Sequence, residues 1–292
     1  MDIGLTGVFG SSPRRDAGFL REFAIGAEEL GFASVWAPDH VVFFPRYESR
    51  YPYSPDGSVW FRPDEGIYDP LMVCQAAAAA TTTLRVGTAV LIATERHPLV
   101  TAKLVMSLDH LSGGRFELGV GSGWSSEEYA ALGIPFERRG ARLDEYLLAM
   151  KAAWTDDVAN FHGEFVEFDD VVLFPKPLTR PHPPILVGGD SHPALRRAAH
   201  LGDGWYGWWV GYELESQLAL LAEELAAADR TGDDSFRIKV GRPPDGSPDD
   251  MAGRAEEARR LGVHELVVAA PIRASHLDAD LREWAETLGV QP

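Results

Sequence analysis

Short, largely apolar segments rich in β-branched residues alternate with helical segments along the chain, and this alternation constrains the fold most strongly. Parallel strands joined by helices produce such a pattern, because each connection between parallel strands must cross the sheet. Several of these segments are apolar throughout, as expected for strands covered on both faces. The predicted strands are residues 3–9, 34–37, 84–92, 115–120, 185–187, 204–206, 237–240 and 265–269.

The segments between these strands have helical character. In the first, Phe19, Phe23 and Ala27 lie on one apolar stripe, and Gly31 is a typical helix stop. Eight strand–helix units predict an α/β fold with a closed (β/α)8 TIM barrel, and an open, doubly wound sheet is the alternative. The predicted helices are residues 19–30, 75–80, 99–111, 143–154, 194–199, 214–228, 251–261 and 277–288.

Two segments interrupt the alternation. The 292 residues suit one barrel, so we treat residues 1–292 as a single domain with insertions at about 41–69 and 156–184. The first insertion is rich in aromatic residues, proline and charge, and a long loop of this kind in a compact domain is usually functional, often as a lid. The second insertion predicts a strand or a hairpin before the fifth barrel strand.

Charge and composition argue against several function classes. The net charge of −17 would repel nucleic-acid phosphates, so we expect no nucleic-acid partner. The single cysteine, Cys74, allows neither an internal disulfide nor a thiolate metal cage, and we interpret it as a core residue. The chain shows no apolar run of about 20 residues and no signal-peptide pattern. We therefore expect a cytoplasmic protein without a membrane partner.

Residues that follow the predicted strands form the candidate site, because the working residues of such barrels lie at the carboxyl ends of the strands. Asp39 and His40 follow the second strand, and this pair suits ligand orientation and proton transfer near neutral pH. Capping of a loop is the alternative role. Ala89 and Val90 near the end of the third strand allow a flat ring close to the backbone, although tight barrel packing also explains them.

Glycines cluster at the end of the fourth strand. Gly121, Ser122, Gly123 and Trp124 form a segment in which a cofactor can lie directly against the backbone. The segment does not match the dinucleotide fingerprint, because Trp124 stands where the last glycine is required. It therefore gives little support to a nicotinamide cofactor.

A second glycine pair follows the fifth strand. Gly188 and Gly189, followed by Asp190 and Ser191, lead into a helix. The free N–H groups and the positive dipole end of such a helix form a phosphate cradle. A tight turn with surface arginines is the alternative.

The acidic chain needs local cations beside any bound phosphate, and Arg96, Lys176, Arg196 and Arg197 are the candidates. The segment after Gly189 does not predict a serine hydrolase, because Pro193 replaces the second glycine of a nucleophile elbow. No metal-binding motif is present, so we predict no metal site.

Taken in their order along the chain, the strand-end motifs resemble those of the luciferase-like monooxygenase family, and specifically of its branch that uses coenzyme F420, a deazaflavin. The resemblance covers nearly the whole chain, although family members often carry a longer segment after the seventh strand. The residues that carry it are 30–40, 51–57, 84–90, 111–124, 129–133, 184–189 and 199–205.

The resemblance implies a barrel of the bacterial-luciferase type with a planar redox ring across its mouth. It implies a cis peptide at Ala89–Val90 that supports the ring, and Asp39 and His40 beside it. The ring edge would contact Gly121, Ser122, Gly123, Trp124 and Glu128, and the phosphate would contact Gly188, Gly189, Asp190 and Ser191.

The implied chemistry is hydride transfer between F420 and an unidentified small organic substrate. We expect His40 to give or take a proton, with Glu128 as the second candidate. Tyr51, Tyr53 and Trp60 are expected to close over the substrate.

Two other functions remain open. One is an FMN-dependent monooxygenase supplied by a separate flavin reductase, and the other is a flavin-binding barrel without turnover. Family members often form dimers through helices near the second and third strands. The alanine-rich helix at residues 75–80 offers a flat face for this contact, so we expect a homodimer.

Overall fold

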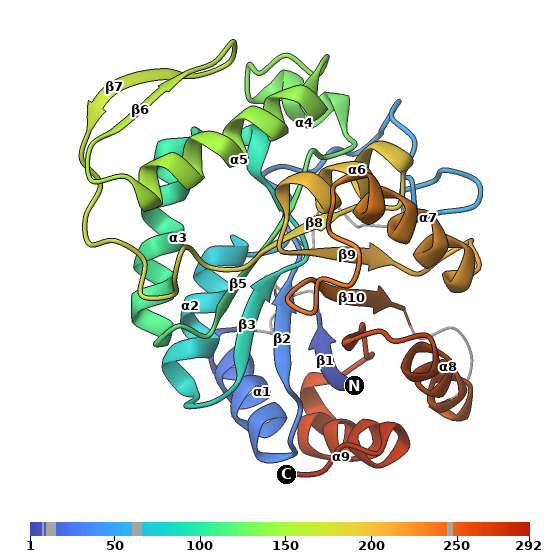
Figure 1. Cartoon of the computed structure of the whole chain (residues 1–292). Coiled ribbons are helices and arrows are strands. Elements are labelled where there is room, and N and C mark those ends of the chain that lie inside the picture. Colours follow the sequence, from blue (N-terminus) through green and yellow to red (C-terminus); the bar gives the residue numbers. More distant parts are fainter. Residues whose placement is uncertain (8, 10–15, 60–65, 244–247) are drawn as a thin grey trace.

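The computed structural model describes residues 1–7, 9, 16–59, 66–243 and 248–292, and they form a closed parallel barrel surrounded by helices (Figure 1). Pairing of β3 with β5 closes the sheet, so the predicted (β/α)8 barrel is confirmed and the open sheet is wrong. In their order around the barrel, the strands are β3 (Arg85–Thr88), β2 (Ser34–Ala37), β1 (Asp2–Thr6), β11 (Glu265–Val268), β10 (Arg237–Arg242), β9 (Gly204–Trp208), β8 (Ile185–Gly188) and β5 (Phe116–Gly121).

The third barrel strand is not continuous, in contrast to the predicted strand over residues 84–92. It is split into β3 and the short β4 (Leu91–Ile92), which pairs with β5. Between the two parts lies a cis peptide bond at Ala89–Val90, at the position that the resemblance implied. A Cβ on Gly119 would lie 1.9 Å from the carbonyl oxygen of Thr88, so only glycine permits this approach of β3 and β5.

Each predicted helix is present, and its ends have a local cause. Asp16 caps the first helix by accepting the Phe19 N–H at 3.0 Å. His97 caps the third helix, which begins with a proline and ends at Gly113 in a left-handed conformation. The helices are α1 (Ala17–Glu29), α2 (Pro70–Ala80), α3 (Pro98–Ser112), α4 (Ser126–Ala131), α5 (Arg139–Thr155), α6 (His192–Leu201), α7 (Leu214–Ala227), α8 (Pro248–Arg260) and α9 (Leu277–Leu288).

Short α4 was not predicted. Two 3-10 turns, η1 (Ala93–Glu95) and η2 (Ala274–His276), complete the helical elements of the described ranges. None of the helices in these ranges combines the length and apolar character needed to cross a membrane.

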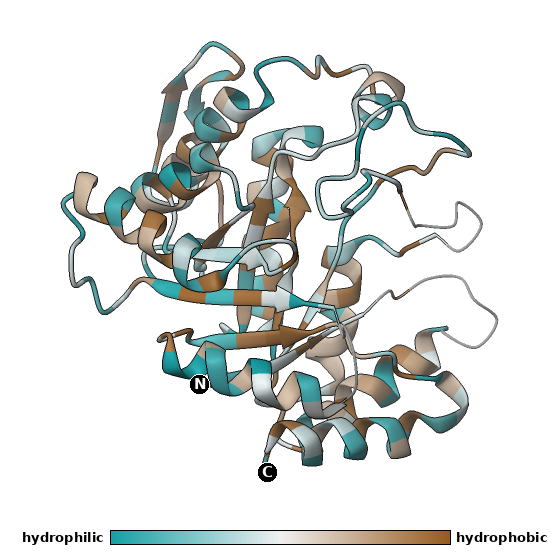
Figure 2. Cartoon of the chain, turned by 90° about the vertical axis from the view of Figure 1, so that its right-hand side faces the viewer, coloured by the Kyte–Doolittle hydropathy of each residue, from teal (hydrophilic) through white to brown (hydrophobic). Residues whose placement is uncertain are grey.

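Apolar side chains fill both the space between strands and helices and the inside of the barrel. Figure 2 shows hydrophobic residues concentrated on the central strands, while the outer helices carry many hydrophilic residues. Inside the barrel, Trp36, Leu186, Tyr206 and Val267 form a buried layer, in which the rings of Trp36 and Tyr206 lie 5.2 Å apart. This layer is a packed floor below the barrel mouth.

A buried network of charges closes the amino end of the barrel. Lys239 Nζ lies 2.7 Å from Glu265 Oε2 and also contacts Glu117. Arg85 Nη2 lies 2.6 Å from the same Glu265 oxygen, and Ser34 Oγ donates to the other one. Burial alone would raise the pKa of Glu265, but Lys239 and Arg85 lower it. Each buried charge therefore has a partner of opposite sign.

The two insertions differ in structure. The second one contains the antiparallel hairpin of β6 (Ala159–His162) and β7 (Glu167–Val171), as predicted, and Phe168 packs with Ala149 of α5. The described part of the first insertion, residues 41–59 and 66–69, contains neither a helix nor a strand. This segment crosses the carboxyl end of the barrel, where it can shape a site.

Glu265→Gln tests the charge network. Because the change leaves Lys239 and Arg85 under-compensated, it is expected to cost about 3–5 kcal/mol of unfolding free energy, measured by urea denaturation at pH 7. The loss should shrink as the pH falls through the lowered pKa of Glu265, since protonation removes the same charge from the wild type. Arg282→Ala, which breaks an exposed ion pair with Asp278, should leave the midpoint of urea denaturation unchanged. Equal effects of both changes would contradict this assignment.

Candidate functional site

The carboxyl ends of the barrel strands bring the predicted site residues together. Val90 points between β5 and β8, because a Cβ on Gly121 or on Gly188 would lie 2.7 Å from one of its methyl groups. Two glycines far apart in the sequence therefore flank one side chain. The absence of a side chain at both glycines makes room for Val90 at the barrel mouth.

His40 is held by Glu128 across the barrel mouth. Its Nδ1 lies 2.8 Å from Glu128 Oε2, and both side chains are largely buried. The other carboxylate oxygen, Oε1, accepts the N–H groups of Val41 and Val42 at 2.5 and 3.2 Å. Glu128 thus orients the imidazole and fixes the chain that follows it. An imidazole that donates from Nδ1 to a carboxylate keeps Nε2 as its basic nitrogen.

The same short helix fixes the start of the insertion loop. Glu127 accepts the N–H groups of Glu48 and of Ser49, the latter at 2.9 Å, and Ser126 Oγ lies 2.8 Å from Ser49 Oγ. Burial opposes ionisation of Glu127, but these donors lower its pKa to about 2. The unpredicted α4 therefore decides where the loop lies.

Aromatic rings of the loop surround Trp124. The centroid of Trp124 lies 5.6 Å from that of His40, 5.4 Å from that of Tyr47 and 5.2 Å from that of Tyr51. Tyr51 in turn lies 5.6 Å from Tyr53. These rings form one wall of the site beside the imidazole, whereas Trp60 lies outside the described residues.

Asp39 is committed to structural contacts at the end of β2. It forms a two-point contact with Arg96, at 2.6 and 2.9 Å, and accepts the N–H of Ile92 at 2.8 Å. Burial raises the pKa of Asp39, and the Arg96 guanidinium opposes that shift. Arg96 also contacts Asp69. It therefore ties β2 to β4 and is not a phosphate-binding cation, in contrast to one of the options raised from the sequence.

The Ser122–Gly123 turn is fixed by two residues that the sequence did not single out for this role. Tyr129 donates its hydroxyl to the Ser122 carbonyl oxygen at 2.7 Å, and Arg139 Nε donates to that of Gly123 at 3.1 Å. Gly123 has a φ of +67°, which side chains other than glycine rarely adopt. A hydrogen-bonding partner this far along the chain is not visible in a local sequence pattern.

The predicted phosphate cradle lies where β8 leads into α6. Gly189 has a φ of +111°, and Ser191 is the N-cap residue, whose side chain makes no capping bond. The Asp190 carboxylate turns away toward β9 and accepts from the Trp208 N–H at 3.2 Å and the Tyr212 hydroxyl at 3.1 Å. Burial raises the pKa of Asp190 to about 7, whereas these two donors oppose the shift.

The expected cations do not gather at this cradle. Arg197 pairs with Asp144 and donates to the Gly140 carbonyl oxygen at 3.0 Å, and Lys176 donates to that of Ala153 at 3.0 Å. Of the four cations proposed from the sequence, only Arg196 on α6 is exposed without such a contact among the described residues. Charge at the cradle therefore comes mainly from the helix end itself.

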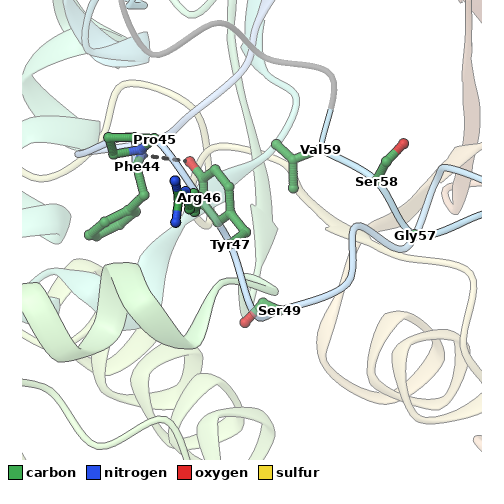
Figure 3. Close-up of a pocket in the computed structure, with 8 residues that line it drawn as sticks. All are labelled: Phe44, Pro45, Arg46, Tyr47, Ser49, Gly57, Ser58 and Val59. Carbon is green, nitrogen blue, oxygen red and sulfur yellow. Dashed lines mark hydrogen bonds between the residues drawn. The ribbon is translucent and has the colours of Figure 1, made fainter.

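A cavity of about 300 Å³ opens within the loop next to the aromatic wall (Figure 3). Phe44, Tyr47 and Val59 give it apolar lining, while Arg46 and Ser49 add polar groups. Tyr47 belongs both to this cavity and to the rings around Trp124. Tyr47 therefore lies between this cavity and the Trp124 ring.

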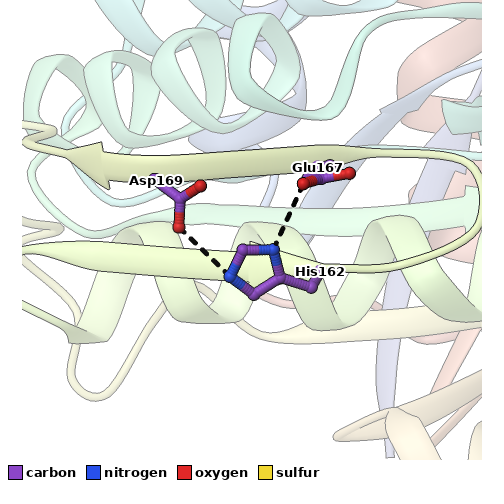
Figure 4. A group of neighbouring side chains, drawn as sticks. All are labelled: His162, Glu167 and Asp169. Atoms are coloured by element: carbon purple, nitrogen blue, oxygen red, sulfur yellow. Dashed lines mark ion pairs between the residues drawn. The ribbon is translucent and has the colours of Figure 1, made fainter.

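The β6–β7 hairpin carries the cluster of His162, Glu167 and Asp169, which Figure 4 shows. Glu167 approaches Nδ1 of the ring at 3.5 Å, whereas Asp169 approaches Nε2 at 3.1 Å. One ligand atom from each residue lies within 4.8 Å of the others, which is close enough for a metal ion, but exposed acidic groups commonly cluster without one. All three side chains are exposed, so we interpret the cluster as a group of surface ion pairs.

Comparison with known proteins identifies the family of this barrel. A family model described as luciferase-like monooxygenase matches residues 5–291. An uncharacterised protein of Mycobacterium tuberculosis is 39% identical over 254 residues, covering 87% of this chain and 85% of that protein.

Two characterised relatives differ in cofactor. The F420-dependent glucose-6-phosphate dehydrogenase of Amycolatopsis mediterranei is 32% identical over 226 residues, covering 75% of this chain and 62% of that protein. The FMNH2-dependent dimethylsulfone monooxygenase of Pseudomonas putida is 39% identical over 177 residues, covering 60% of this chain and 47% of that protein.

Solved structures share the architecture at lower identity. The monooxygenase RslO1 of Streptomyces bottropensis superposes with a TM-score of 0.77 at 21% identity, covering 99% of this chain and 98% of that one. The F420-dependent tetrahydromethanopterin reductase of Methanopyrus kandleri gives a TM-score of 0.75 at 15% identity, covering 99% of both chains. Together with the match over residues 5–291, these likenesses show that the chain belongs to the luciferase-like monooxygenase family.

Proposed function

We propose that this protein is an F420-dependent oxidoreductase that transfers a hydride between the deazaflavin and a small organic substrate. The observation that carries the proposal is the His40–Glu128 couple, 2.8 Å apart, beside the glycine-flanked backbone at Ala89–Val90. The F420-dependent relative supports F420 because its likeness extends over 75% of the chain, whereas the FMNH2-dependent relative is more identical, 39% against 32%, over 60% of the chain.

The residues at the mouth fit a phosphorylated ring cofactor. Gly121 and Gly188 make room for the Val90 side chain, because added Cβ atoms there would meet its methyl groups. Ser191 and the amino end of α6 supply the donors that a phosphate needs. The ring would rest on Ala89–Val90 with its edge at Ser122–Gly123 and Trp124. When bound, F420 supplies or accepts the hydride.

The protein contributes orientation, proton transfer and exclusion of water. His40 gives or takes the substrate proton at Nε2, while Glu128 holds the ring through Nδ1. Asp39 and Arg96 fix the end of β2, so the imidazole position does not drift. Trp124 and Tyr51 limit access of water on the loop side. The adjoining 300 Å³ cavity receives part of the substrate.

An FMN-dependent monooxygenase is the second candidate, and the dimethylsulfone monooxygenase likeness favours it. The two functions predict different ligands for the same mouth. A barrel that binds a cofactor without turnover would need no proton carrier, so the role of His40 separates it from both enzymes.

Cofactor titration tests the proposal directly. Quenching of cofactor fluorescence by the purified protein is expected to give at least tenfold tighter binding of F420 than of FMN. Gly188→Ala should weaken binding of the preferred cofactor at least tenfold, because its Cβ would lie 2.7 Å from Val90 Cγ1. Gly253→Ala is the matched control, since nothing lies within 4 Å of that position. Tight FMN binding without F420 binding would overturn the choice of cofactor.

Substitution of the couple tests proton transfer. His40→Ala is expected to lower kcat about 10²–10⁴-fold. Glu128→Gln should lower kcat less, because the amide oxygen can still accept one hydrogen bond but cannot hold both His40 Nδ1 and the Val41 and Val42 N–H groups as the carboxylate does. His200→Ala changes an exposed histidine of α6 and should leave kcat unchanged. Turnover that survives His40→Ala intact would favour a different proton carrier.

We further propose that the protein forms a homodimer through α2 and α3, which pack against each other. Exposed apolar residues follow one stripe of α3, namely Val100, Leu104 and Leu111, and Met72 begins a similar stripe on α2. Neither helix has an exposed acidic residue, in a chain of net charge −17. A second copy can therefore meet this face without repulsion between carboxylates, through a self-complementary contact.

The dimer is tested by light scattering coupled to size exclusion. The double change Leu104→Glu and Leu111→Glu is expected to convert the dimer to a monomer, because it buries like charges against each other across the two-fold axis. Leu220→Glu on α7 introduces a charge at a comparably exposed leucine and should leave the dimer intact. A wild-type monomer at micromolar concentration would exclude the proposal.

A further inference from the structure

Glu95 is a buried acid at the mouth that the proposed mechanism does not use. It ends η1, directly after β4, and its exposed fraction is 8%. A Cβ on Gly123 would lie 3.7 Å from Glu95 Oε1, which places the carboxyl behind the Ser122–Gly123 turn. The side chain therefore lies against the segment that is expected to carry the edge of the cofactor.

Neither carboxyl oxygen of Glu95 has a hydrogen-bond partner among the described residues. The nearby donors are already committed. Arg96 donates to Asp39 and Asp69, while Tyr129 donates to Ser122 and shares its hydroxyl oxygen with Thr94. A buried carboxylate without donors is strongly unfavourable, so this carboxyl is expected to hold its proton.

Glu95 lies near two other acids, and those two receive the hydrogen-bond donors that Glu95 lacks. Asp39 receives two guanidinium contacts and one N–H, and Glu128 receives two N–H groups and the His40 imidazole. Glu95 receives none. Burial and the charges of Glu128 and Asp39 raise the pKa of Glu95 to about 9, although Arg96 opposes the shift.

We propose that Glu95 is a positioning residue that must remain protonated for the mouth to bind its anionic cofactor and for Glu128 to hold His40. This inference rests on the proposed function, since it concerns the same site. Loss of the Glu95 proton would place a third carboxylate charge beside Asp39 and Glu128. That charge would repel a phosphorylated cofactor and add to the electrostatic repulsion beside the Glu128–His40 contact.

The charged groups around Glu95 support this assignment. Asp39 and His40 come from the end of β2, Glu128 and Tyr129 from α4, and Arg96 follows η1. On the α5 side, Arg139 donates to Gly123 and stacks on Phe136, 4.0 Å from its ring centroid, and Arg142 donates to the Pro135 carbonyl. These cations are thus directed to other partners, and no hydrogen bond from them reaches the Glu95 carboxyl in the part of the chain that the structure describes.

Thermal unfolding of the free protein between pH 5 and 10 tests the proton on Glu95. The unfolded state releases this proton near pH 4.5 and the folded state near pH 9, so this group lowers wild-type stability as the pH rises through that window. Glu95→Gln lacks the titration. Its Tm relative to the wild type should rise from pH 5 to pH 9 and then level off. A Tm difference that is independent of pH would overturn the assignment of the proton.

Cofactor titration over the same pH range tests the consequence for binding. Wild-type affinity for F420 should fall by up to tenfold per unit above about pH 9, whereas Glu95→Gln should keep its affinity. Asp109→Asn is the matched control, because Asp109 is buried but receives the Thr179 N–H and hydroxyl and lies away from the mouth. Asp109→Asn should show the same loss of F420 affinity at alkaline pH as the wild type. Parallel curves for wild type and Glu95→Gln would refute the proposed role.

A second substitution at Glu95 keeps the test valid if Glu95→Gln fails to fold. Glu95→Met has a similar volume without a titratable or polar group, so it should also abolish the alkaline loss of affinity. If the wild type and all variants bind neither F420 nor FMN, the proposed function is rejected. The unfolding data would still decide whether Glu95 holds its proton. Normal cofactor binding with an unchanged pH profile in both Glu95 variants would reject only this inference.

Discussion

The candidate site depends on one carboxylate, that of Glu128. Its two oxygens bind His40 Nδ1 and the N–H groups of Val41 and Val42, so it joins α4, the end of β2 and the start of the insertion loop. Ser125 fixes the carboxylate in turn by capping α4. Because these bonds are buried, the orientation of the imidazole and the path of the loop are set together.

The buried acidic groups at the two ends of the barrel differ in their partners. At the amino end, Lys239 and Arg85 compensate Glu265, and the network closes the barrel. At the carboxyl end, Glu95 is buried without a donor, next to Glu128 and Asp39, the partners of His40 and Arg96. An uncompensated acid lowers stability, and functional sites are where proteins retain such groups. The contrast marks the carboxyl end as the working end of this barrel.

Much of the fold could be predicted because periodicity and end signals are local. Proline at the start of α3 and glycine after it delimit that helix in the sequence itself. The break between β3 and β4 could not be seen from periodicity, because Ala89 and Val90 are compatible with a continuous strand. The site was predicted in part: Asp39 and His40 were placed by their position after a strand, but Glu95 and Arg139 carry no local signal.

The sequence by itself determined the alternation of strands and helices, and with it which residues lie at the barrel mouth, since strand ends are encoded by neighbouring residues. Only the tertiary structure decided which of those side chains are partners. Arg96 pairs with Asp39 across 57 positions, and Glu128 binds His40 across 88. These contacts depend on distances between strands that barrel closure sets, and those distances are not encoded in neighbouring residues.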